Sequence, residues 1–295
     1  LGDRSRFRRL LQREGGELKP ATQSSSGGAA DLIKRLTARR VDIAVYGGAQ
    51  EIVVAKGAKV RLAANGETLQ RCGGRFEARR LRAYGKWNVD KPLARFDIDD
   101  STVAVGDFRG QFCGGGLRGG LRFQRRKKRI EQCEVSLNRL DLHEWYTSIG
   151  PEEGLLKGWL DLRLRFDPAP LIPDSIAGTG RFEIRDMVAD NIPLQRTLVM
   201  LLALPGLSHV EFDRVRSPLK VQGGKVYTEM EATGKPLAFT SDGWTGLDGY
   251  FRHEVSGLLS EEFVDTLRPI IRGGLARQED GRRLFECTVR GTFED

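Results

Sequence analysis

The chain has 295 residues, of which 39% are hydrophobic and 30% are charged, and 36 of them are glycine. This length and apolar content are sufficient for a hydrophobic core, and the charged fraction is that of a soluble protein. The longest apolar run, Leu198–Leu207, contains Pro205 and is too short to span a bilayer. Glycine is well above its ordinary frequency of about 7%. Because glycine is unfavourable inside helices and useful at turns and bulges, the composition favours β structure.

The net charge of +8 is unevenly distributed. Residues 1–140 contain 30 Lys and Arg against 15 Asp and Glu, whereas residues 141–295 contain 18 against 25. The basic half is suited to an anionic partner, either phospholipid headgroups or nucleic acid. We interpret most of these charges as a solvated surface, so nucleic acid is not an expected partner.

Residues 1–40 are predicted to be a basic N-terminal segment that is partly helical and partly flexible. Residues 14–28 have the composition of a connector. Residues 30–40 are predicted to be helical, because Leu32, Ile33 and Leu36 would share one face of a helix.

From Val41 the apolar period changes to two, and residues 41–153 are predicted to form an antiparallel β meander. Asp99 and Asp100 mark a turn between two strands of this meander. The run Gly114–Gly120 is interpreted as a glycine-rich bend. A short helix is expected at Asp141–Ser148.

Residues 154–295 are predicted to be a second β region with two helices. The clearest strand alternates Leu160, Leu162, Leu164 and Phe166 with charged residues. One helix is expected at 193–204, where Pro193 suits the first turn, and another at 260–271, where Ser260 is the expected N-cap. The last strand alternates apolar side chains with polar ones at Phe285, Cys287, Val289 and Phe293.

The pattern as a whole predicts a mostly β protein, formed by a long curved antiparallel sheet with a few short helices. Residues 41–295 could form one continuous sheet, and a sandwich or a barrel is an alternative. In each clear strand one face is apolar and the other is charged. Two short helices are little cover for so many strands. Either the sheet folds onto itself, or its apolar face holds an apolar ligand.

The residues of common catalytic and metal sites do not occur in the required patterns. His143, His209 and His253 are far apart and form no HExxH or HxH motif, and no GxSxG motif is present. Among the four cysteines, Cys133 and Cys287 lie in the apolar phase of strands, which favours buried free thiols. A disulfide such as Cys113–Cys133 is an alternative that the sequence alone does not decide. The sequence thus predicts no catalytic residue, no metal and no cofactor.

A run of six cations near one predicted hairpin is a candidate contact for anionic lipid headgroups, each cation near a membrane surface contributing about 1 kcal/mol. Alternatively, these charges protect a sheet edge from pairing, or bind nucleic acid. The six residues are Arg122, Arg125, Arg126, Lys127, Lys128 and Arg129.

Four spaced segments in residues 154–293 resemble the C-terminal region of the AsmA-like proteins of the bacterial envelope, including the TamB and YhdP types. They are AGTGRFEIRDMVADNIPLQRTLVMLLALPGL, VEFDRVRSPLKVQGGKVYTEMEATG, WTGLDGYF and FECTVRGTFED. Their order and spacing carry the resemblance, which covers about half the chain. The N-terminal membrane anchor typical of that family is not among these residues.

The resemblance implies a β-groove in the periplasm that holds phospholipid acyl chains between the inner and outer membranes, in a protein anchored to the inner membrane by a segment outside this chain. The alternating apolar residues are the expected lining: Leu160, Leu162, Leu164, Phe166, Phe182, Ile184, Phe285, Val289 and Phe293. A second hypothesis is an assembly module for outer-membrane protein biogenesis, in which the sheet edges pair with client strands or other envelope proteins.

Overall fold

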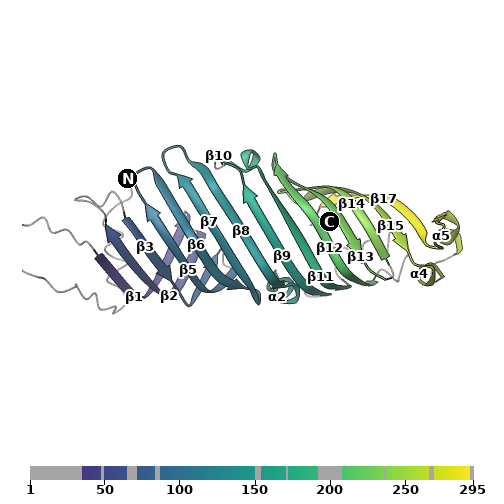
Figure 1. The fold of residues 1–295 in the computed structure, drawn as a ribbon, viewed down its shortest axis with the longest axis horizontal. Coiled ribbons are helices and arrows are strands. Elements are labelled where there is room, and N and C mark those ends of the chain that lie inside the picture. The colour runs from purple at the N-terminus through teal and green to yellow at the C-terminus, as the bar shows by residue number, and fades with distance from the viewer. Residues whose placement is uncertain are drawn as a thin grey trace, which may run out of the picture. The chain divides into compact units, whose positions relative to one another are not determined.

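The computed structural model describes residues 35–47, 50–64, 72–83, 87–149, 154–170, 172–191, 208–235, 237–265 and 269–292. These residues form a mostly β protein, in which 17 strands are hydrogen-bonded into one antiparallel sheet (Figure 1). The prediction of an antiparallel β fold with a few short helices is confirmed. None of the helices in the described part of the chain is long and apolar enough to cross a membrane.

The chain divides into two compact units, Leu1–Gln111 and Phe112–Asp295. Each described strand of the first unit pairs antiparallel with its neighbours, as the alternating pattern from Val41 onward predicted. Its strands are β1 (Arg35–Gly47), β2 (Gln50–Ala64), β3 (Cys72–Glu77), β4 (Arg80–Ala83), β5 (Trp87–Ile98) and β6 (Thr102–Phe112), the last of which ends just past the boundary.

The β5–β6 connection is the turn that Asp99 and Asp100 predicted. The Asp99 carboxylate accepts hydrogen bonds from the backbone N–H groups of Ser101, at 2.7 Å, and Thr102, at 2.6 Å. An aspartate side chain that binds the following backbone in this way fixes a tight turn.

The second unit contains eleven of the described strands, and it holds all the predicted ligand-binding residues that the structure describes. The longer strands pair in the order β7-β8-β9-β11-β12-β13-β14-β15-β17, each antiparallel to the next along the chain, and β10 and β16 are two-residue additions. The bounds are β7 (Gly115–Gln124), β8 (Arg129–Asp141), β9 (Leu155–Phe166), β10 (Ala169–Pro170), β11 (Gly178–Asp190), β12 (His209–Gln222), β13 (Lys225–Thr233), β14 (Leu237–Gly246), β15 (Tyr250–Leu259), β16 (Ala276–Arg277) and β17 (Arg283–Thr292).

Two helices of the second unit, α2 (Leu142–Ile149) and α4 (Glu261–Asp265), begin where the sequence predicted them. In α2 the Asp141 carboxylate accepts a hydrogen bond from His143 N at 2.8 Å, as an N-cap does. In α4 the hydroxyl of Ser260 accepts one from Phe263 N at 3.2 Å. A single 3-10 turn, η1, covers Pro173–Ser175.

Two helix predictions need correction. Arg35–Arg40 belongs to β1, not to a helix, because it pairs with β2 from Arg35 opposite Ala63 to Arg39 opposite Lys59. The predicted helix at 260–271 is two helices, since α4 ends at Asp265 and α5 is Pro269–Gly274. Proline suits the first position of a helix, which is where Pro269 stands in α5. The predicted helices at 193–204 and in residues 1–34 lie outside the described residues.

The glycine-rich run is also different from the prediction, because most of it is strand and not bend. The turn is confined to Cys113 and Gly114, and β7 begins at Gly115. A Cβ atom on Gly115 would lie 2.6 Å from the backbone of Leu140 in β8, and one on Gly119 would lie 2.8 Å from Glu134 O. Glycine is needed here so that two strands can approach closely, and not to reverse the chain.

Candidate functional site: the apolar face of the second unit

One face of the second unit carries most of the aliphatic side chains of its strands. Cross-strand partners lie on the same side of a sheet, and here Leu162 is opposite Leu137 on β8 and opposite Phe182 on β11. The same side of the sheet can be followed through the pairing to the last strands, where Gly257 is opposite Phe285 and His253 is opposite Val289. The alternation predicted for β9, β11 and β17 is therefore a single continuous surface, which we call the apolar face.

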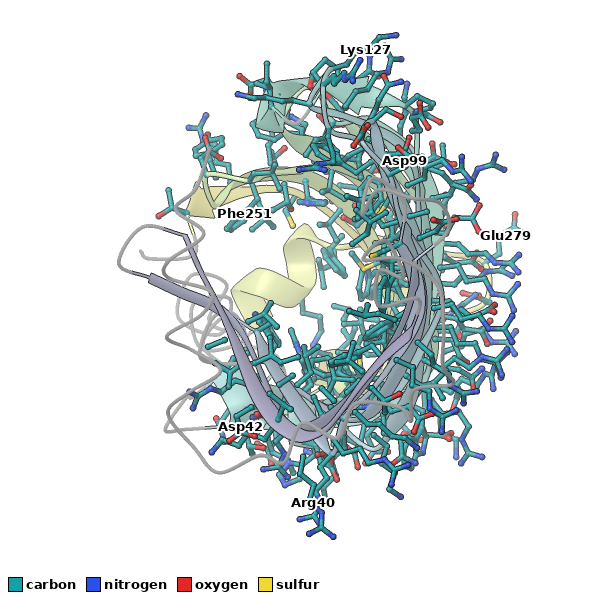
Figure 2. The ribbon with its side chains drawn as sticks, turned by 90° about the vertical axis from the view of Figure 1, so that its left-hand side faces the viewer. Arg40, Asp42, Asp99, Lys127, Phe251 and Glu279 are labelled. Atoms are coloured by element: carbon teal, nitrogen blue, oxygen red, sulfur yellow. The ribbon has the colours of Figure 1, made fainter. Side chains whose placement is uncertain are left out.

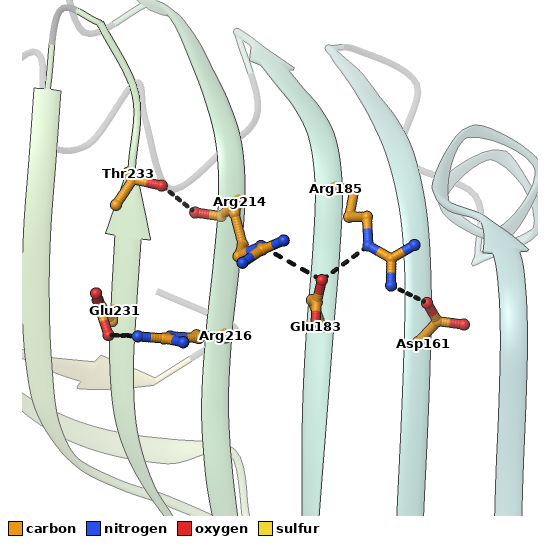
Figure 3. A network of polar contacts seen from close by, with 7 residues as sticks. All are labelled: Asp161, Glu183, Arg185, Arg214, Arg216, Glu231 and Thr233. Atoms are coloured by element: carbon orange, nitrogen blue, oxygen red, sulfur yellow. Dashed lines mark hydrogen bonds and ion pairs between the residues drawn. The ribbon is translucent and has the colours of Figure 1, made fainter.

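The opposite face is charged and carries an ion-pair network across four strands (Figure 3). Arg185 on β11 lies 3.3 Å from Asp161 on β9 and donates a 2.7 Å hydrogen bond to Glu183. Glu183 in turn lies 3.4 Å from Arg214 on β12. The hydrogen bond from Arg185 lowers the pKa of the Glu183 carboxyl, which keeps this face ionised and hydrated.

Figure 2 shows Phe251 on the inner side of this part of the sheet, and it shows Lys127 and Glu279, which lie in turns between strands, projecting outward. An ionised face is costly to dehydrate, so it is the apolar face that needs cover.

Part of the apolar face packs into two core clusters, each of which includes residues of a helix. Helix α2 packs Leu142 and Tyr146 against Leu140, Leu156 and Ala189 in one core cluster. At the C-terminal end, α4 contributes Val264 and Phe263 to a second cluster with the strands. The buried strand residues of that second cluster are Val210, Phe212, Val215, Ala232, Leu237 and Leu259. We call the strand residues of these two clusters, which include residues of α2 and α4, the helix-covered half.

The other half of the apolar face belongs to neither cluster. Most of its side chains are half-buried, with Val221 buried among them, and none of them belongs to a cluster that includes a described helix. We call this surface the open half, and it consists of Leu162, Leu164, Phe166, Leu219, Val221, Val226, Phe251, Val255 and Val289. Leu164 shows how the open half is built, because it leans over Gly180 of β11, where an added Cβ would lie 2.6 Å from Leu164 Cδ2.

The predicted lining residues are therefore on one surface but in two environments. Leu162, Leu164, Phe166 and Val289 lie in the open half. By contrast, Leu160, Phe182, Ile184 and Phe285 pack against the helix-covered clusters and are partly core. Phe293 lies outside the described residues.

Five residues of the open half were not among those predicted: Leu219, Val221, Val226, Phe251 and Val255. The signal was present in the sequence, because Leu219 and Val221, like Phe251 and Val255, keep the two-residue period of their strands. Their membership in the same face as Leu164 follows only from the successive pairing of β11 with β12, β12 with β13, β13 with β14 and β14 with β15.

The predicted headgroup residues lie together at one end of the β7–β8 hairpin. Arg125, Arg126, Lys127 and Lys128 form its turn, and Arg122 and Arg129 lie on the strands beside it; all six are exposed. Arg129 donates a 3.0 Å hydrogen bond to Pro168 O, next to β10. The turn adjoins the open half, since Cys133, four residues past Arg129, is opposite Phe166.

The cysteines are free thiols, all four within the described residues. Cys133 and Cys287 lie on the apolar face, opposite Phe166 and Val255. Burial raises the pKa of both thiols, so they remain protonated and act as small apolar groups. Among the described residues, no group of three or more His, Cys, Asp or Glu is arranged to hold a metal ion.

Comparisons with known proteins identify no relative. No protein-family model matches the chain, and no curated protein and no solved structure is significantly similar to it.

Proposed function

We propose that this protein binds a lipid non-catalytically, with the acyl chains lying against the open half of the apolar face. The observation that carries the proposal is the contrast between two halves of one surface. One half is packed into core clusters with residues of α2 and α4, whereas the other is apolar, mostly half-buried and part of no cluster with a helix among the described residues. An acyl chain that covers such a surface gains about 25 cal/mol for each Å² of apolar area removed from water.

The sequence resemblance extends this proposal to a place and a partner. AsmA-like proteins act in the bacterial envelope, so the proposed role is to hold phospholipid between the inner and outer membranes. The protein would work in the periplasm, with attachment to the inner membrane by a segment outside this chain. The cations of the β7–β8 turn would contact anionic headgroups next to the open half, through attraction that salt screens.

The test compares one substitution on each face. Leu164→Asp places a carboxylate on the open half, between Val135 and Gly180 in the pairing register. Thr179→Asp makes the same change of charge on the exposed face of β11, between Arg165 and Lys220, where a carboxylate is well accommodated. Protein purified without detergent from a bacterial host is extracted with organic solvent, and the extract is analysed by mass spectrometry.

We expect near-stoichiometric phospholipid in the wild-type protein and in Thr179→Asp, and a loss of at least tenfold in Leu164→Asp, since burying an unpaired carboxylate against hydrocarbon costs several kcal/mol. Circular dichroism establishes that each variant is folded. A folded Leu164→Asp protein that retains lipid, or a folded wild-type protein that never contains it, would show that the apolar face does not bind acyl chains.

A second candidate function is supported by the last strand. Along one side β17 pairs with β15 over its whole length, but along the other side only Arg283 and Leu284 pair with β16 among the described residues. Residues Glu286–Arg290 therefore present a sheet edge to which an extended client strand could add. Capture of outer-membrane β-barrel precursors by lipid-free protein, abolished by Thr288→Pro, would favour this assembly role over lipid binding.

A further inference from the structure

A small polar cluster interrupts the open half on β14 and β15. The imidazole of His253 lies across Gly243, its partner in the pairing register, with its ring close to where a Cβ atom would be. Its Nδ1 is 3.2 Å from Ser241 Oγ, and its Nε2 is 3.3 Å from Thr245 Oγ1. We call Ser241, Thr245 and His253 the hydroxyl–imidazole cluster.

The imidazole of this cluster is uncharged at neutral pH. Burial lowers the pKa of His253, and Asp242, which is next to Ser241 on β14, only partly opposes that effect. The adjacent side chains on the same face are Phe251 and Val255 on its own strand, β15, and Val289 opposite it on β17, none of which is ionisable. The cluster therefore offers hydrogen bonds but no positive charge to a ligand.

One O–H donor of the cluster is not used within the cluster. A neutral imidazole donates from one nitrogen and accepts at the other. Ser241 is 5% exposed, so its hydroxyl is best satisfied by donating to Nδ1, and Nε2–H then donates to Thr245 Oγ1. The hydroxyl of Thr245, which is half-buried at the surface of the apolar face, keeps its own O–H for another acceptor.

A second hydroxyl beside the cluster has no hydrogen-bond partner in the described part of the chain. Thr228 on β13 is opposite Gly243 of β14, and His253 on β15 is opposite the same glycine from the other side. Its Oγ1 is buried and makes no hydrogen bond among the described residues. An unsatisfied buried hydroxyl costs about 1–3 kcal/mol, and an acceptor oxygen from a ligand would remove that cost.

We propose that the hydroxyl–imidazole cluster, together with Thr228, binds a carbonyl oxygen of an ester-linked lipid whose acyl chains lie on the open half. This inference rests on the proposed function and specifies its ligand class. A neutral ester carbonyl matches free O–H donors in uncharged surroundings. A carboxylate would be buried without a cation, and an ether oxygen is a much poorer acceptor than a carbonyl oxygen.

The experiment is a competition between two lipids that differ only in this linkage. Delipidated protein is offered an equimolar mixture of diacyl phosphatidylglycerol and its dialkyl ether analogue of equal chain length, and the bound lipids are quantified by mass spectrometry. We expect wild-type protein to prefer the ester by roughly threefold to tenfold, as one or two hydrogen bonds would give.

Two conservative variants locate the preference. In Thr245→Val and in Thr228→Val we expect the ratio to approach one through weaker binding of the ester lipid, because each variant keeps the shape of the side chain and loses the O–H. Thr240→Val makes the same change on the exposed face of β14 and should retain the wild-type ratio.

The outcomes separate this inference from the function on which it rests. Equal binding of both lipids by the wild-type protein, or a preference that survives in Thr245→Val and in Thr228→Val, overturns the carbonyl site and leaves the lipid-binding surface standing. Binding of neither lipid overturns the proposed function and this site with it.

Discussion

The helix-covered half and the open half of the apolar face are made by the same strands with the same alternation, but they have different physical states. In the helix-covered half, Leu140 and Leu259 are each 1% exposed and Val264 of α4 is 2% exposed. In the open half, Leu162, Leu164 and Phe166 remain half-buried. The difference lies in the cover and not in the strands, so an apolar alternation alone does not distinguish a core from a binding surface.

The largest expected effect is a difference in stability between the two halves. Leu259→Ala should lower the free energy of unfolding by about 2–5 kcal/mol, because it opens a cavity beneath α4. Leu164→Ala should lower it by only about 1 kcal/mol, since that side chain is partly hydrated already. Urea unfolding of lipid-free protein gives both values. Equal losses would show that the open half is sealed in the same way as the core.

The second largest effect is a difference in stability between alanine substitutions at two adjacent glycines, of which only the first is in tight contact with a neighbouring backbone. In Gly115→Ala the new methyl group would lie 2.6 Å from the backbone of Leu140, and we expect a loss of about 1–3 kcal/mol. In Gly116→Ala the nearest atom, Asn138 O, is 4.0 Å away, and we expect little change. Thermal unfolding of the two variants measures the difference. If Gly115→Ala is as stable as Gly116→Ala, β7 is not packed as described.

The sequence was a good guide where a pattern is local. The strict alternation at Leu160–Phe166 predicted both the strand β9 and its two faces, and Asp141 and Ser260 predicted two helix starts. It was a poor guide where a distant partner decides. Residues 35–40 have a pattern that suits a helix, and pairing with β2 overrides it.

The division of the apolar face and the hydroxyl–imidazole cluster depend on such distant partners. Nothing in the eight residues of α2 says that they bury Leu140. Similarly, Ser241 and Thr245 meet His253 only because the β14–β15 hairpin sets Gly243 opposite that histidine. The two-residue period places Ser241, Gly243 and Thr245 on one face, and this is the part of the cluster that the sequence does contain.

The smallest expected effect concerns pH, and it tests the open half alone. Burial lowers the pKa of His253 below its ordinary value of about 6.5, so the unfolded chain binds a proton at a higher pH than the folded chain does. The contribution of the neutral imidazole to stability is therefore complete above about pH 6.5 and is lost as the pH falls below it. The melting temperature of the wild-type protein should fall between about pH 7 and about pH 5 by more than that of His253→Gln does.

His143→Gln is the matched control for this pH test, because His143 is an exposed residue of α2 on the helix-covered side. It should keep the pH dependence of the wild-type protein. If His253→Gln and the wild-type protein lose stability in parallel as the pH falls, the imidazole is as well hydrated in the folded protein as in the unfolded chain. The hydroxyl–imidazole cluster would then be an open, water-filled site, and the carbonyl of a bound lipid would have to displace water to reach it.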